Sequence, residues 1–260
     1  MRRVLERAAP AMLGLLVLAG WEGAVRAWAV PHYILPGPAA IAQAMVADWP
    51  LLSASLLVTL RVAVLALLAA VTLGGLLAIL FAQSEWLERA LFPYAVILQV
   101  TPIVAIAPLI LIWVDDVLLS LLICAWIVAF FPILSNTVLG LNSADANLRD
   151  LFRLYGATRW QTLLFLRLPS ALPFFLAGLR VAGGLALIGA VVAEFVAGAG
   201  GTGSGLAFRI LEASYQLRIP RMFAALALIS AAGIAIFALL GGLQHLLLRH
   251  WHESALRAER

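Results

Sequence analysis

The chain has 260 residues, of which 64% are hydrophobic and 12% are charged. An ordinary soluble domain carries about a quarter charged residues, so this composition excludes a water-soluble globule and indicates a protein whose solvent is the bilayer. Its positive charge is carried by arginine alone, because the sequence contains no lysine, and arginines near helix ends are typical of membrane orientation rather than nucleic-acid binding. Cys124 is the single cysteine, which excludes a disulfide framework and a thiolate metal site.

The N-terminus has two interpretations. Arginines precede the apolar run 11–21, and Ala27-Trp28-Ala29 resembles a cleavage site, a combination typical of a secretory signal peptide. The same run also suits a first transmembrane helix with tryptophans at the interface. We expect the segment to be retained as a transmembrane helix.

Long apolar runs predict an all-α, polytopic membrane protein. A bilayer core about 30 Å thick requires about 20 apolar residues in a helix. Six segments meet this requirement, at about 10–30, 56–82, 90–114, 117–140, 172–197 and 222–248.

The arginine distribution predicts how these helices are oriented. In a six-helix arrangement both termini and the long polar loop lie on the arginine-rich side, so the positive-inside rule predicts cytoplasmic termini. We divide the chain into an N-terminal transmembrane helix with a short external helix (1–55), a core transmembrane domain (56–248) whose cytoplasmic loop covers 144–169, and a cytoplasmic tail (249–260).

The cytoplasmic loop is the most informative segment. Its first half is a short amphipathic helix that breaks at Gly156, and a second helical stretch is expected to stop at Pro169, whose ring cannot continue it. Such a segment can enter a groove on a soluble partner, or it can rest on lipid headgroups as an interfacial helix. The residues alone leave both interpretations open.

The spacing within the loop resembles the cytoplasmic Glu-Ala-Ala loop of binding-protein-dependent ABC importer permeases. That pattern continues with three residues, a glycine, nine residues and Ile-x-Leu-Pro. Here Asp150 stands at the glutamate position, Gly156 is the glycine, and nine residues separate it from Leu166, after which Leu168-Pro169 close the pattern. The two alanines are replaced by leucine and phenylalanine. Further similarities to the branch for nitrate, sulfonates, taurine and vitamin precursors are Leu35-Pro36-Gly37-Pro38, Gln99 through Trp113, Phe131-Pro132, Asn136-Thr137, Gly178-Leu179-Arg180 and Ala193-Glu194.

This resemblance implies the type I importer permease fold and a set of partners. The permease would pair with a second copy of itself, sit on two ATP-binding subunits that hold ATP and Mg²⁺, and receive a small solute from an external binding protein. No cofactor is expected on this chain. The resemblance implies that the loop couples the permease to its ATPase through Asp150, Arg153, Leu154, Tyr155, Gly156, Ala157, Thr158 and Pro169.

Polar residues and prolines inside the predicted spans are candidates for the translocation path or its gate. Glu194 is an acidic residue near the end of a span, which marks function or a structural partner. Pro102 and Pro108 are expected to break the third span, because a broken helix is tolerated where a cavity or the bundle satisfies its backbone. The candidates are Gln99, Thr101, Pro102, Asn136 and Glu194, with close packing in the bundle as the alternative for each. For Arg180 we favour a side chain that reaches the interface over one that binds solute.

Other functions have weaker support in the sequence. The glycine-rich loop 198–205 contains a formal G-x-G-x-x-G but follows a membrane helix, so we interpret it as a flexible external loop rather than a dinucleotide site. The sequence has no Walker motif, and its histidines form no ligand cluster, so neither an ATPase nor another enzyme is predicted. A self-contained secondary transporter or channel is the alternative, for which internal repeats are expected. The solute and the role of Asp115-Asp116 stay open.

Overall fold

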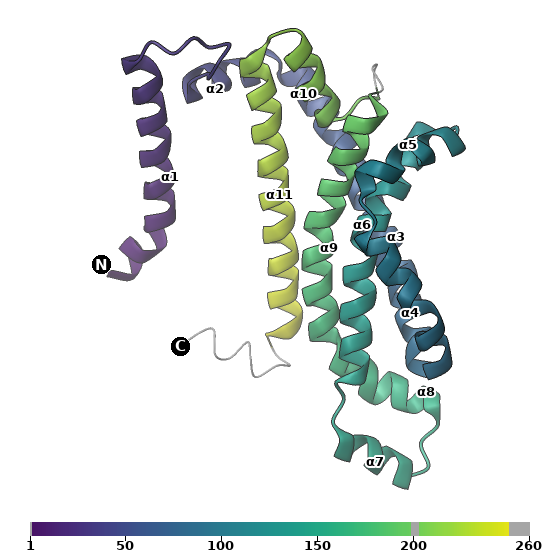
Figure 1. Ribbon diagram of the computed structural model, residues 1–260. Coiled ribbons are helices and arrows are strands. Elements are labelled where there is room, and N and C mark those ends of the chain that lie inside the picture. The colour runs from purple at the N-terminus through teal and green to yellow at the C-terminus, as the bar shows by residue number, and fades with distance from the viewer. Residues whose placement is uncertain (1, 199–202, 250–260) are drawn as a thin grey trace. The chain divides into compact units, whose positions relative to one another are not determined.

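The computed structural model describes residues 2–198 and 203–249, and these are almost entirely helical (Figure 1). Residues 199–202, half of the glycine loop predicted at 198–205, and nearly all of the predicted tail lie outside the described residues. The helices are α1 (Arg2–Ala27), α2 (Pro38–Ala47), α3 (Trp49–Gln83), α4 (Glu85–Val100), α5 (Ile103–Trp113), α6 (Val117–Asn142), α7 (Ala146–Leu154), α8 (Arg159–Thr162), the π-helical turn η1 (Leu163–Arg167), α9 (Leu168–Ala197), α10 (Leu206–Tyr215) and α11 (Ile219–Leu248).

Five of the six predicted membrane segments coincide with helices that are long and apolar enough to span a bilayer. Within the described residues, four helices meet this criterion: α3, α6, the continuous stretch Arg159–Ala197, and α11. A fifth span results if α4 and α5 are counted as one bent segment. The first predicted segment forms α1, which is helical but is not among these four or five.

The third predicted segment bends by 100° between α4 and α5. Thr101 ends α4 in an extended conformation, and Pro102 occupies the N-cap of α5. The backbone N–H and the hydroxyl of Thr101 both donate to the carbonyl of Ile97, at 3.1 and 2.7 Å, so the last helical hydrogen bond of α4 is made at Thr101. The expected break at Pro102 is therefore present, whereas the expected break at Pro108 was wrong, because α5 continues through that residue.

The chain divides into two compact units, Met1–Val58 with Gly198–Ser230, and Thr59–Ala197 with Ala231–Arg260. In the first unit, Asp48 and Arg221 form a bidentate ion pair with two N–O distances of 2.6 Å, although they lie 173 residues apart in sequence. Glu22 pairs with Arg26 at 2.7 Å and accepts a hydrogen bond from the backbone N–H of Ala39 at 3.0 Å. These contacts fix the ends of the helices that form this unit.

The second unit is built on the pair α6 and α9, which lie side by side in Figure 1 and make the most extensive contact between two helices. Their backbones approach closely at two glycines. A methyl group on Gly178 would lie 2.7 Å from the carbonyl oxygen of Pro132, and one on Gly189 would lie 2.8 Å from the Cα of Ala125. Small residues permit such close packing between membrane helices, where no hydrophobic effect drives association.

Candidate functional site

The loop that connects α6 to α9 carries the coupling residues proposed from the sequence. Figure 1 shows α7 projecting beyond the end of α6. Asp145 caps the first turn of α7 by accepting hydrogen bonds from the N–H groups of Asn147 and Leu148, at 2.7 and 3.3 Å. Every residue of α7 is exposed or half-buried. This short helix therefore presents most of its surface to its surroundings.

Gly156 ends α7 in a left-handed turn. Its φ is +68°, and the N–H groups of Gly156 and Ala157 donate to the carbonyls of Arg153 and Phe152, at 3.0 and 2.9 Å. This is the Schellman pattern that closes many helices, and glycine adopts it without a steric penalty. A methyl group added at Gly156 would meet nothing within 4 Å. Glycine is therefore needed at this position for its backbone angle rather than for space.

Thr158 begins the second half of the loop with a capping box. Its hydroxyl accepts from the N–H of Gln161 at 3.3 Å, and its own N–H donates to the Gln161 side chain at 2.8 Å. Only Ala157 separates this box from the Gly156 turn. Hydrogen bonds therefore close the end of the first half of the loop and the start of the second half, and one residue lies between the two.

The expectation that the helix stops at Pro169 was wrong. Pro169 lies in the first turn of α9, and the chain stays helical from Arg159 to Ala197. The preceding turn, η1, is π-helical, and the N–H of Leu168 donates five residues back to the carbonyl of Leu163. A wider turn of this kind can accommodate a proline, whose ring would clash with a carbonyl in a regular helix. The local widening replaces the predicted stop.

Large apolar side chains stand exposed around the Gly156 turn. The exposed fractions are 84% for Leu154, 83% for Tyr155 and 63% for Trp160. Beside them, Asp150 and Arg153 form an exposed ion pair at 3.5 Å, which contributes little to stability. Apolar residues grouped on a projecting element mark a surface that a protein partner or a membrane covers.

The candidate path residues do not converge on one place. Gln99, Thr101 and Pro102 share the bend between α4 and α5. Asn136 donates to the carbonyl of Pro132 at 2.8 Å and packs where α6 meets Gly178. Glu194 is 3% exposed and accepts a hydrogen bond at 3.1 Å from the hydroxyl of Thr59 on α3.

Three charged residues have environments that the sequence analysis missed or left open. Arg61 is the one charged residue of α3, and it is exposed with no ion-pair partner in the described part of the chain. The sequence already marked Arg61 as a candidate functional residue, because it is a charged residue inside a long apolar run, and ionisable residues in spans usually face a water-filled space or a partner. Arg180 places its guanidinium 3.8 Å from the ring centroid of Phe237, a cation–π contact. Asp116 caps α6 by accepting from the N–H of Leu119 at 2.6 Å.

A model of the family described as binding-protein-dependent transport system inner membrane component matches residues 70–252. The chain belongs to this family. The riboflavin transport system permease protein of Chloroflexus aurantiacus is 37% identical over 249 residues, which cover 92% of this chain and 88% of that protein. The formylaminopyrimidine transport permease protein of Halalkalibacterium halodurans is 34% identical over 249 residues, covering 95% of this chain and 98% of that protein.

The fold is also similar to that of a solved transporter. The crystal structure of an amino acid ABC transporter with histidines matches with a TM-score of 0.63 and 19% identity, covering 79% of this chain and 96% of that one. The permease therefore has the type I fold, as predicted, and is a multi-pass protein of the bacterial inner membrane. It is the membrane subunit of an ABC importer, a transport component rather than a catalytic one.

Proposed function

We propose that this permease forms the translocation path for a small solute delivered by an external binding protein, and that the loop around Gly156 couples it to a separate ATPase. The assembly contains a second copy of the chain and two ATP-binding subunits, which hold ATP and Mg²⁺. Both termini lie in the cytoplasm. The observation that carries the proposal is the projecting α7 with its closed left-handed turn and its exposed apolar side chains.

Those features fit a soluble partner better than a lipid surface. Leu154, Tyr155 and Trp160 provide apolar anchors of the kind that dominate protein interfaces, while Asp150 and Arg153 form a polar rim beside them. In the proposed mechanism, ATP closes the two ATPase subunits and moves the docked loops together. The membrane helices then change between inward-open and outward-open states, so ATP on the partner biases the two conformations.

Cysteine labelling at Leu154 tests both the orientation and the docking. In a Cys124→Ala background, Leu154→Cys should react with an impermeant maleimide only from the cytoplasmic side, and the ATPase subunits should protect it. Val46→Cys is the matched control, because Val46 is 78% exposed and lies on α2, which we place outside. It should react from outside whether or not the ATPase is present. Labelling of Leu154→Cys from outside, or equal labelling with and without the ATPase, would contradict the proposal.

We propose Glu194 as a gating residue and Gln99, Thr101, Pro102 and Asn136 as further positions along the path. Glu194→Gln keeps the shape of the side chain and an oxygen that can accept from Thr59, but it removes the charge. We expect intact complexes and a severalfold lower rate of uptake. Thr59→Val, which removes the hydroxyl and keeps the carboxylate, separates the loss of this hydrogen bond from the loss of charge.

Uptake in this test is measured with the ligand that the cognate binding protein retains. Because relatives are named for riboflavin and formylaminopyrimidine transport, we propose a small heterocyclic solute. A retained sulfonate or nitrate would contradict that part of the proposal. Unchanged uptake by Glu194→Gln would instead assign Glu194 a purely structural role.

A further inference from the structure

A basic groove lies between the coupling loop and the turn that joins α3 to α4. Its volume is about 590 Å³. Four arginines line it from α7, α8 and η1, and two glutamates line it from α4. These charged residues are Arg149, Arg153, Arg159, Arg167, Glu85 and Glu88, and we call the cavity the basic groove.

The arginines of the basic groove are poorly compensated within the described residues. Arg149 is half-buried and Arg159 is exposed, and among the described residues neither has an ion-pair or side-chain hydrogen-bond partner. Arg167 is half-buried and donates to the backbone carbonyl of Ala82 at 2.7 Å, which satisfies one N–H but supplies no negative charge. The charges of Arg149 and Arg153 repel that of Arg167, and the Glu85 carboxylate offsets part of this repulsion.

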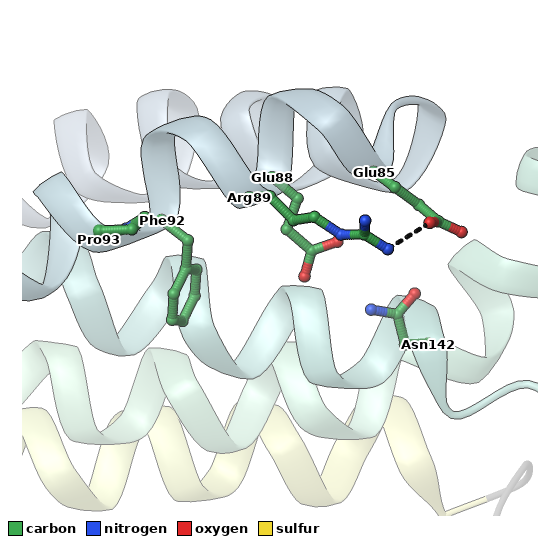
Figure 2. Close-up of a pocket in the computed structure, with 6 residues that line it drawn as sticks. All are labelled: Glu85, Glu88, Arg89, Phe92, Pro93 and Asn142. Carbon is green, nitrogen blue, oxygen red and sulfur yellow. Dashed lines mark hydrogen bonds and ion pairs between the residues drawn. The ribbon is translucent and has the colours of Figure 1, made fainter.

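The glutamates of the groove compensate this cluster only in part. Figure 2 shows the Glu85 carboxylate pointing toward Arg89 on the same helix, with which it pairs at 3.0 Å. Glu88 is half-buried and, in the described part of the chain, forms no ion pair with any of the four arginines. Arg153 forms an ion pair with the carboxylate of Asp150, outside the groove lining, at a longer N–O distance of 3.5 Å. An excess of positive charge therefore remains at the groove.

We propose that the basic groove binds a phosphate group, carried either by an anionic phospholipid headgroup or by a soluble phosphate compound. Guanidinium groups match phosphate oxygens in geometry and charge, and basic pockets beside membrane helices attract anionic headgroups. A bound phosphate would compensate the half-buried Arg149 and Arg167, whose mutual repulsion otherwise opposes the packing of the loop against α3 and α4. The inference does not depend on a coupling role for Gly156.

The test compares two double variants of the full-length permease, reconstituted with its ATPase subunits. Arg149→Gln with Arg159→Gln removes the two unpartnered arginines of the groove. Arg218→Gln with Arg249→Gln removes the same charge elsewhere and is the matched control, because both arginines are exposed and outside the groove. Native mass spectrometry counts retained phosphatidylglycerol against phosphatidylcholine, and pyrophosphate is titrated separately as the soluble probe.

We expect the groove variant to bind its phosphate probe roughly 25-fold more weakly, at roughly fivefold per arginine, with little change in the control. Retention of phosphatidylglycerol would identify the ligand as a lipid headgroup. Tight binding of pyrophosphate with no retained phosphatidylglycerol would identify it as a soluble phosphate compound. Arg149→Lys with Arg159→Lys should restore much of the binding, which separates lost charge from lost folding. Equal affinities in the two glutamine variants would overturn the proposal, and so would cross-linking of the groove to an acidic ATPase segment with no phosphate probe bound.

Discussion

Gly156→Val is expected to abolish coupled transport while the membrane helices stay folded. The native φ of +68° is open to glycine, whereas a β-branched residue there carries about 1–2 kcal/mol of backbone strain. Relief of that strain would break the hydrogen bonds from Gly156 and Ala157 that close α7. The exposed Leu154 and Tyr155 would then leave their positions, so the ATPase subunits should dissociate or hydrolyse ATP without transport.

A conservative series at this position separates backbone strain from bulk. Because an added methyl group has open space around it, Gly156→Asn should retain most function, since asparagine tolerates left-handed angles. Gly156→Ala should lie between asparagine and valine. Subunit ratio, ATPase rate and uptake in proteoliposomes are the three measurements. Normal coupled uptake by the valine variant would remove the strongest residue-level support for this loop as the coupling element.

Gly178→Ala is expected to destabilise the permease, although replacing glycine by alanine normally strengthens a helix. The added methyl group would lie 2.7 Å from the Pro132 carbonyl oxygen, so α6 and α9 must move apart. Such overpacking costs about 1–3 kcal/mol. Thermal unfolding of the purified protein in detergent measures the effect as a lower midpoint.

The same substitution six residues further along α9 provides the control. Gly184 lies on the same helix, and a methyl group there would meet nothing within 4 Å. Gly184→Ala should therefore leave the midpoint unchanged or raise it slightly. Equal effects of the two substitutions would show that the close approach of α6 and α9 does not limit stability.

The sequence predicted the helical fold well because its signals are long and local. A long, predominantly apolar run such as 117–140 has one favourable conformation in a bilayer, and α6 follows it closely. Prolines were harder to interpret. Pro102 lies at the break between two helices, whereas Pro108 and Pro169 lie inside helices, because the effect of a proline depends on whether neighbouring turns can adjust. Residue type alone does not contain that information.

The candidate site likewise has some features that local sequence signals predict and others that they do not. The turn at Gly156 was predictable because glycine at a helix end is a local signal. The bonds between Asp48 and Arg221 and between Thr59 and Glu194 join residues 173 and 135 positions apart, and no local periodicity connects them. Arg61 was overlooked inside its apolar run, although its charge was visible in the sequence. The coupling and gating roles stay predictions.

The continuous helix from Arg159 to Ala197 has a mechanical consequence. Its 39 residues are helical without a break, and at a rise of about 1.5 Å per residue Arg159 and Glu194 lie about 50 Å apart along the path of the helix. The capping box at Thr158 begins this helix one residue after the Gly156 turn. We therefore expect a displacement of α7 to reach the first turn of this helix directly, because only Ala157 lies between the two hydrogen-bonded turns. The π-helical turn η1 is the place where we expect the helix to bend under such a displacement.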